Sequence, residues 1–154
     1  MSASRRGHLG HLVRRFAAAW SRREPGADDV AWVRATLLSA EWALWSRMAV
    51  ADRRHSIEVA RRFAATPDGW GRDEIAAALL HDVGKIESGL GAVGRTVATV
   101  VGPRTGRFRT YHDHERIGAE LLQRAGAPAN TVELVAGNGD PATRAAIERA
   151  DDSI

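Results

Sequence analysis

Five titratable side chains lie on or beside the apolar faces of predicted helices. They are His55, His81, Asp82, His114 and Asp151. His55, for example, shares a helix face with Val59 and Phe63, which follow it at helical spacing. One such residue is usually a hydrogen-bonded core histidine or a capping aspartate, but several on separate helices need a common explanation. Buried carboxylates require pairing or metal coordination, and imidazole together with carboxylate oxygen suits a divalent Mn, Fe, Co, Ni or Zn ion.

The segment HDVGK, from His81 to Lys85, follows an apolar run and holds the only lysine of the chain. His81 and Asp82, at the end of a predicted helix, would bring two metal-binding groups to one place. Gly84 permits a tight turn and a close backbone approach. Lys85 is a compact cation and a candidate phosphate contact, although the helix dipole also favours a lysine at a helix C-terminus.

Hydrophobic spacing, capping residues and helix breakers predict helices along the whole chain. The expected helices cover about 8–23, 28–48, 50–65, 72–82, 91–101, 112–125, 128–136 and 140–154, with an irregular basic stretch at 102–110. Strand signals are almost absent. We therefore predict an all-α, single-domain bundle of about six to eight helices, in which N-terminal helices within 1–48 pack on or precede a core formed by 49–154.

The 154 residues carry a formal net charge of +3 and no cysteine, which excludes disulfides and thiolate metal sites. No stretch approaches the roughly 18 apolar residues of a membrane span. The N-terminus lacks a signal-peptide pattern, so we expect a cytoplasmic protein without a membrane partner. The paired arginines are typical of solvated helix faces, which disfavours a nucleic-acid partner. The tryptophans of the helix at 28–48 suit the core better than a dimer face, and a homodimer stays an alternative.

Four segments carry a resemblance to a known family. They are RRHSIEVARRF (53–63), LLHDVGKIE (79–87), HDHERIGAELL (112–122) and AIERADDSI (146–154). In this order they resemble the H…HD…D pattern of the HD superfamily of metal-dependent phosphohydrolases. The second segment is similar to that of the bacterial HDIG-type subset, although Val83 stands at its third position. The resemblance covers about two-thirds of the chain and implies the same compact helical fold.

The resemblance implies one divalent metal ion, whose identity among Mn, Fe, Co, Ni, Zn and Mg the ligand types leave open. The implied ligands are His55, His81, Asp82 and Asp151. Asp152 is the alternative to Asp151, which is favoured because it shares a helix face with Ile147. Members of the family that bind a second metal use later histidines, of which His114 matches the first. The segment VAGNGD (135–140) has no histidine where the next is expected, so we expect one metal rather than two.

The resemblance also implies hydrolysis of a phosphomonoester, nucleotide or phosphodiester by a metal-activated water. The predicted catalytic residues are Asp82, Lys85 and His114. Lys85 and three arginines are the candidate contacts to a small phosphorylated substrate or nucleotide: Arg54, Arg107 and Arg109. The alternative function is a catalytically weak or inactive domain that binds metal or nucleotide in a regulatory role. A di-iron oxygenase needs both metals, which VAGNGD disfavours.

Overall fold

The computed structural model describes residues 23–87 and 106–154, and in the second range the side chains from residue 113 onward. The regular elements are α2 (Ala27–Thr36), α3 (Ser39–Ser46), α4 (Val50–Ala64), α5 (Arg72–Leu80), the 3-10 helix η1 (Val83–Ile86), α7 (Gly106–Arg124), α8 (Ala129–Val135) and α9 (Pro141–Asp152). No strand occurs within the described ranges, which confirms the predicted all-α fold. The helices predicted at 8–23 and 91–101 lie outside them, apart from residue 23.

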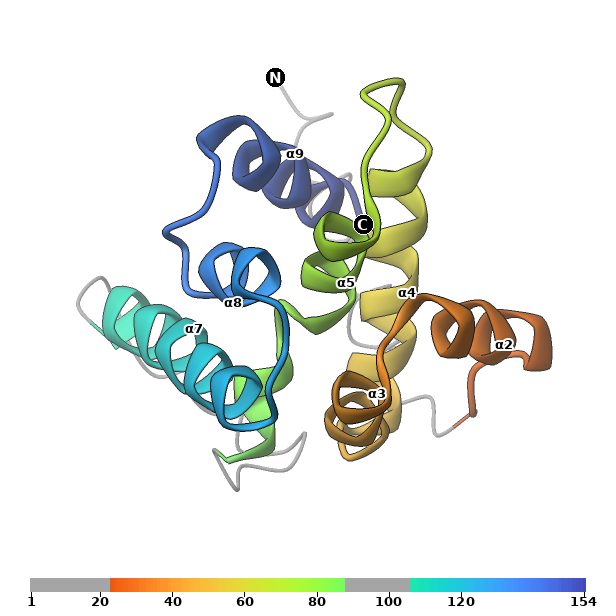
Figure 1. Ribbon diagram of the computed structural model, residues 1–154, viewed down its shortest axis with the longest axis horizontal. Coiled ribbons are helices and arrows are strands. Elements are labelled where there is room, and N and C mark those ends of the chain that lie inside the picture. Colours follow the sequence, from red (N-terminus) through yellow and green to blue (C-terminus); the bar gives the residue numbers. More distant parts are fainter. Residues whose placement is uncertain (1–22, 88–105) are drawn as a thin grey trace, which may run out of the picture.

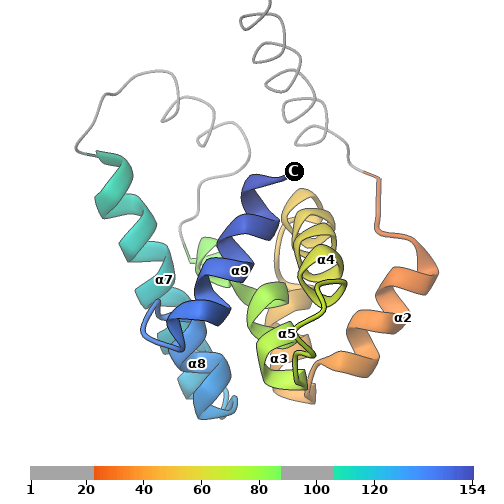
Figure 2. The same cartoon turned by 90° about the horizontal axis from the view of Figure 1, so that it is seen from above.

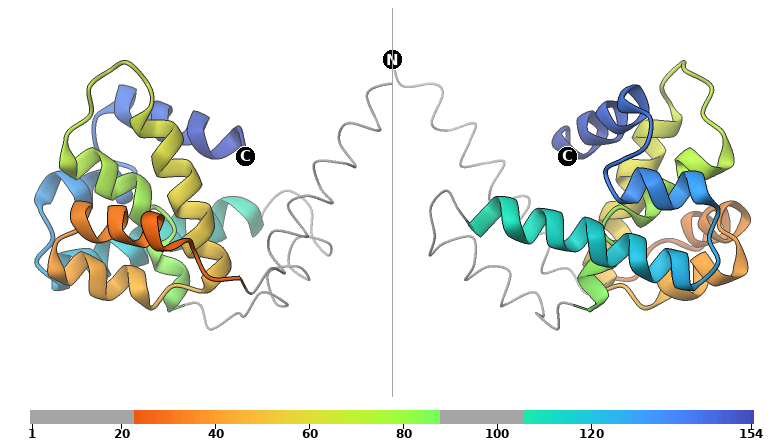
Figure 3. Two further views of the ribbon diagram at one scale, coloured as in Figure 1. Left: turned by 90° about the vertical axis from the view of Figure 1, so that its right-hand side faces the viewer. Right: turned by 60° about the vertical axis from the view of Figure 1, so that its left-hand side comes forward.

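The helix α5 forms the centre of the bundle. Its buried stretch runs from Ala76 to Leu80, and its small alanine side chains allow neighbouring helices to approach closely. It packs against α4 on one side and α8 on the other (Figure 1). Figure 2 shows α2 and α7 at opposite sides of the bundle, and Figure 3 shows α8 between α7 and α9. The C-terminal end of α5 therefore emerges among α4, α7 and α9. None of the described helices combines the length and apolar character that crossing a bilayer requires.

The single helix predicted over 28–48 is wrong, because the chain breaks between α2 and α3. Leu37 and Leu38 have extended backbones at the break. The Leu38 N–H donates to Glu41 Oε2 at 2.8 Å. Glu41 is fully buried and also accepts from Arg72, at 2.5 Å from Nη1 and 3.2 Å from Nη2. In an unbroken helix the Leu38 N–H would bond to the preceding turn, so this arrangement requires the break.

The helix α7 begins earlier than predicted. It starts at Gly106, whereas the sequence suggested a start near residue 112 and an irregular stretch at 102–110. That expectation is wrong for 106–110, where arginine alternates with other residues. Arginine is a good helix former, so a basic composition alone is a poor signal for irregular structure.

Two glycines allow η1 to cross α7 at backbone contact. A Cβ atom at Gly84 would lie 2.0 Å from the backbone oxygen of His114 and 2.9 Å from the Gly118 nitrogen. A Cβ at Gly118 would in turn lie 3.1 Å from a methyl group of Val83 and 3.2 Å from the Gly84 nitrogen. The predicted close approach at Gly84 is thus confirmed, and it fixes the segment that follows Asp82 against α7.

We expect Gly84→Ala to lower the free energy of unfolding by about 2–3 kcal/mol, as overpacking in a filled core does. The added methyl group would meet backbone atoms, which cannot rotate away. Urea denaturation followed by circular dichroism measures the loss. The matched control is Gly26→Ala, where the nearest atom would be Asp29 Oδ2 at 3.8 Å, and where we expect a loss below about 1 kcal/mol. Equal losses at the two glycines would contradict the crossing contact.

Candidate metal centre

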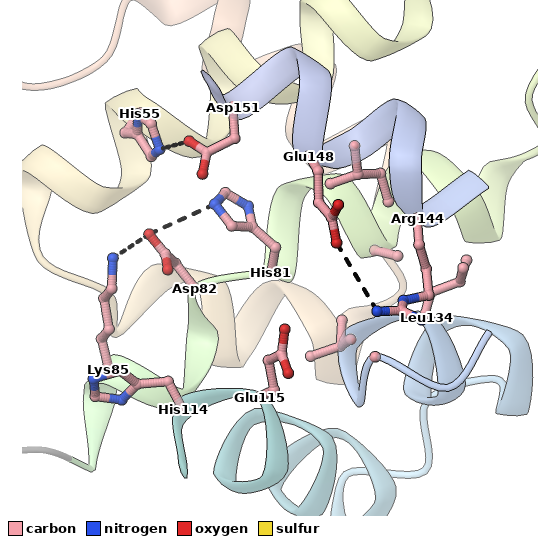
Figure 4. A pocket seen from close by; sticks show the side chains of 14 residues that line it. His55, His81, Asp82, Lys85, His114, Glu115, Leu134, Arg144, Glu148 and Asp151 are labelled. Carbon is pink, nitrogen blue, oxygen red and sulfur yellow. Dashed lines mark hydrogen bonds and ion pairs between the residues drawn. The ribbon is translucent and has the colours of Figure 1, made fainter. Parts of the chain in front are cut away.

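A cavity of about 250 Å³ opens between the ends of the central helices. Helices α4, α5, α7, α8 and α9 and the η1 segment all contribute to its walls (Figure 4). Six residues singled out in the sequence line it: His55, His81, Asp82, Lys85, His114 and Asp151. The fold therefore gathers into one cavity residues that are widely separated in the sequence.

Each of these side chains is aimed by the element that carries it. His55 lies on the inner face of α4, one and two turns before the fully buried Val59 and Phe63. His81 is the C-cap of α5. Asp151 belongs to the last turn of α9, where it follows the buried Ala150. The apolar residues on the same faces anchor the helices, and the polar ones point into the cavity.

The donor atoms converge. His55, His81 and Asp82 each offer one ligand atom, and these atoms lie within 4.8 Å of one another. Asp151 adjoins this group of three through His55, because its Oδ1 lies 2.7 Å from His55 Nε2 (Figure 4). Two imidazoles and two carboxylates form a donor set suited to a divalent transition metal.

His81 presents the clearest sign of a metal ligand. Its Nδ1 lies 2.8 Å from the Ala78 carbonyl oxygen, which can only accept a hydrogen bond. In the neutral ring, Nδ1 therefore carries the proton and Nε2 holds a lone pair that a metal ion could use. This Nε2 is buried and has no hydrogen-bond partner, and it lies 3.6 Å from Asp82 Oδ2. A histidine fixed through one nitrogen by a backbone carbonyl, with the other nitrogen bare, is the usual arrangement around a bound metal. The residues present thus fit a divalent ion.

The charges of the cavity keep its carboxylates ionised. Burial alone would raise the pKa of Asp82, but the charges of His81 and Lys85 and a hydrogen bond from Lys85 hold it well below its ordinary value. Burial opposes ionisation of Asp151 too, yet the hydrogen bond from His55 lowers its pKa. Burial would lower the pKa of His55, and Asp151 and Asp82 outweigh this and raise it. At neutral pH both carboxylates are available as ligands.

These shifts predict how the stability of the metal-free protein depends on pH. A lowered carboxyl pKa stabilises the fold above the ordinary value of 3.8, and this contribution is lost as the pH falls below it. The raised pKa of His55 stabilises the fold below 6.5, and that contribution is lost as the pH rises through the folded-state value. We expect the Asp82, Asp151 and His55 group to stabilise the chelated protein most between about pH 4 and 6.5. Urea titrations of wild type and Asp82→Asn from pH 3 to 8 measure this pH dependence. If the two proteins differed in free energy of unfolding by the same amount at every pH, the prediction would be contradicted.

Of the three predicted substrate arginines, Arg54 alone has a described side chain, and it is not among the residues that line the cavity. The side chains of Arg107 and Arg109 lie outside the described residues, as do those of the stretch before them. Asp152 is exposed, and Asp151 rather than Asp152 lines the cavity. In the segment VAGNGD, Asn138 is exposed and does not line the cavity either.

Three charged lining residues were missed from the sequence: Glu115, Arg144 and Glu148. Arg144 and Glu148 lie seven and three residues before Asp151, on the same face of α9. Arg144 Nη2 and Glu148 Oε1 are 3.9 Å apart. The helical spacing that singled out Asp151 would have found both residues, because every residue on that face approaches the same cavity.

Comparison with known protein families identifies a family for this chain. The family described as HD domain matches residues 53–151, which is more than half of the chain. The matched range begins two residues before His55 and ends at Asp151, so it spans all four converging donors. No curated protein and no solved structure matches the chain significantly.

Proposed function

Because the chain belongs to the HD domain family, we propose that it is a metal-dependent phosphohydrolase. The observation that carries the proposal is the bare, buried Nε2 of His81, which lies among three further donors. Hydrogen bonding within the protein accounts for Nδ1 of that ring and leaves Nε2 unexplained. A bound cation accounts for it, and the family supplies the class of reaction.

Four residues would hold the ion: His55, His81, Asp82 and Asp151. When bound, a divalent ion supplies a hydroxide nucleophile near neutral pH and stabilises negative charge on phosphoryl oxygens. In the metal-free arrangement the Asp151 carboxylate forms an ion pair with His55. Both partners of this short ion pair would instead hold the ion in the loaded protein.

The surrounding residues would bind the substrate and move protons. Lys85, held beside Asp82, is the fixed cation that contacts the phosphoryl oxygens. Asp82 is ionised and accepts a proton from the attacking water. We assign to His114, which also lines the cavity, the protonation of the leaving oxygen. Water adds to phosphorus, the bond from phosphorus to the leaving oxygen breaks, and the products are phosphate and an alcohol.

The far part of the cavity would hold the rest of the substrate. Its apolar walls are the aliphatic side chains of Leu134, Val135 and Ile147, and no Phe, Tyr or Trp lines it among the described residues. The imidazole rings that line the cavity belong to the groups assigned to the metal and to proton transfer, so the described walls offer no further aromatic face for a nucleobase. These walls favour a small phosphomonoester over a nucleotide.

Arg144 is a further candidate contact to the substrate, because its side chain lines the cavity. We expect Arg144→Gln to raise KM about tenfold with a smaller change in kcat, because a charged hydrogen bond to substrate is worth roughly 1.5–3 kcal/mol and the guanidinium is partly exposed. Steady-state kinetics with a hydrolysed phosphomonoester measures both constants. Arg149→Gln, on the same helix but exposed and away from the cavity, is the control. Equal KM values for the two variants would contradict the assignment.

The decisive experiment measures metal content and hydrolysis together. Protein purified without chelator is analysed by mass spectrometry, then stripped with EDTA and assayed with p-nitrophenyl phosphate before and after adding Mn²⁺, Co²⁺, Ni²⁺, Zn²⁺ or Mg²⁺. We expect close to one metal per chain, no hydrolysis after stripping, and recovery with at least one ion. Metal binding without any hydrolysis would favour the regulatory alternative. Absence of binding by every ion would overturn the proposal.

A further inference from the structure

We propose that Arg62 is a positioning residue, which holds the turn that carries Asp151 against α4 whether or not a metal is bound. The inference rests on the proposed function, because it takes Asp151 as a ligand. Arg62 Nη1 donates to the backbone oxygen and to the hydroxyl of Ser153, both at 3.0 Å. Arg62 lies on α4, and Ser153 is the C-cap of α9.

Arg62 and Ser153 lie on the same two helices as the proposed ligands His55 and Asp151, at a fixed spacing from them. Arg62 follows His55 by seven residues, which is two turns of α4, so both lie on the face toward α9. His55 reaches Asp151, and Arg62 reaches Ser153, two residues further along. The same two helices are thus joined by one contact inside the cavity and by another at the exposed surface.

Arg62 supplies a hydrogen-bond donor and a positive charge at the C-terminal end of α9. The last carbonyl groups of a helix have no partner within it and carry partial negative charge, which a cation stabilises. The Ser153 hydroxyl donates onward to the Ala150 carbonyl oxygen at 2.8 Å. Arg62, Ser153 and Ala150 therefore form a chain of hydrogen bonds that encloses Asp151 between its anchored ends.

The chain of hydrogen bonds matters because the inner contact is given up when metal binds. His55 and Asp151 would both hold the ion, so the 2.7 Å contact between them would be lost. The bonds from Arg62 to Ser153 involve no metal donor and persist. Ile154, half-buried against the core, also helps to hold the turn, so the loss of Arg62 loosens Asp151 without releasing it.

The test compares Arg62→Ala with Arg61→Ala, its exposed neighbour, which contacts Asp29 and Trp32 instead. Mn²⁺ is titrated calorimetrically into the stripped full-length chain. We expect Arg62→Ala to raise the Kd for Mn²⁺ about tenfold, as the loss of groups that orient metal ligands does. Arg62→Lys should recover part of the affinity because an ammonium can still reach the Ser153 carbonyl. Arg61→Ala should leave the Kd within about twofold of wild type.

Hydrogen exchange of the metal-free proteins gives a readout that needs no ion. We expect the amides of the last turn of α9 to exchange faster in Arg62→Ala and at the wild-type rate in Arg61→Ala. Equal Mn²⁺ affinity in Arg62→Ala and wild type would overturn the positioning role, even if exchange were faster. If wild type binds Mn²⁺ and the two variants bind it equally well, this inference is wrong but the proposed function is not affected. A wild type that binds none of the ions fails the proposed function, and the role of Arg62 with it.

Discussion

Asp151→Asn is expected to weaken metal binding by at least about 100-fold and to abolish measurable hydrolysis. Loss of a group that merely orients a ligand costs 10–100-fold, so loss of a charged ligand should exceed that range. The amide that replaces the carboxylate is neutral and is a poor ligand for a divalent cation competing with water. The carboxylate of Asp151 also forms the 2.7 Å ion pair with His55, which the neutral amide of the variant cannot form.

The neighbouring residue provides a matched control. Asp152→Asn makes the same chemical change one position along the chain, on a side chain that is exposed. We expect its metal affinity and its kcat/KM to stay within about twofold of wild type. Calorimetric titration and hydrolysis of p-nitrophenyl phosphate measure the pair, with circular dichroism to verify that both variants fold. If Asp152→Asn lost the metal and Asp151→Asn kept it, the assignment of the last ligand would be wrong by one residue.

Glu41→Ala should produce the largest loss of stability, about 3 kcal/mol. Breaking a buried ion pair costs roughly 3–5 kcal/mol because the remaining charge is left without a partner. Glu41 is fully buried, but the Arg72 side chain is 30% exposed and keeps its contact with Asp73, which favours the lower end of the range. The variant also loses the acceptor for the Leu38 N–H at the start of α3.

Urea denaturation measures this loss, and an exposed ion pair supplies the comparison. Arg47 and Glu87 lie 3.9 Å apart, with side chains 56% and 52% exposed. Glu87→Ala should therefore change the free energy of unfolding by less than about 1 kcal/mol. Glu41→Gln keeps the size and one acceptor oxygen, and it should fall between wild type and Glu41→Ala. A loss in Glu41→Ala no larger than that in Glu87→Ala would show that the buried pair does not stabilise the junction of α2 and α3.

The sequence was informative wherever helical spacing decided the outcome. His55 was found because it shares a face with Val59 and Phe63, and both of those residues are fully buried. Helical spacing also favoured Asp151 over the exposed Asp152, and it is Asp151 that lines the cavity. Helix type and the inward faces follow from local periodicity, which a single sequence contains in full.

Features set by distant contacts could not be predicted in this way. No proline or glycine marks the break at Leu37 and Leu38, which depends on Glu41 pairing with Arg72, 31 residues away. The crossing of Gly84 and Gly118 likewise joins two segments whose proximity only the fold determines. Arg144 was missed for a different reason. Its spacing from Asp151 places both residues on one face of α9, but a charged residue on a helix face is usually solvated and does not by itself indicate a cavity.

The order of the donors along the chain has a consequence for biosynthesis. Ribosomes build a protein from its N-terminus, so α4 and α5 emerge with three donors while α9 is still to be made. The 69 residues between Asp82 and Asp151 (151 − 82) take roughly 3–14 s at about 5–20 residues per second. If the proposed four ligands hold a metal, a nascent or truncated chain that lacks α9 would have an open site with three donors, which would hold an ion only weakly. Tight retention of the metal would begin when α9 docks, so metal retention would indicate that synthesis has passed Asp151 and that α9 is in place.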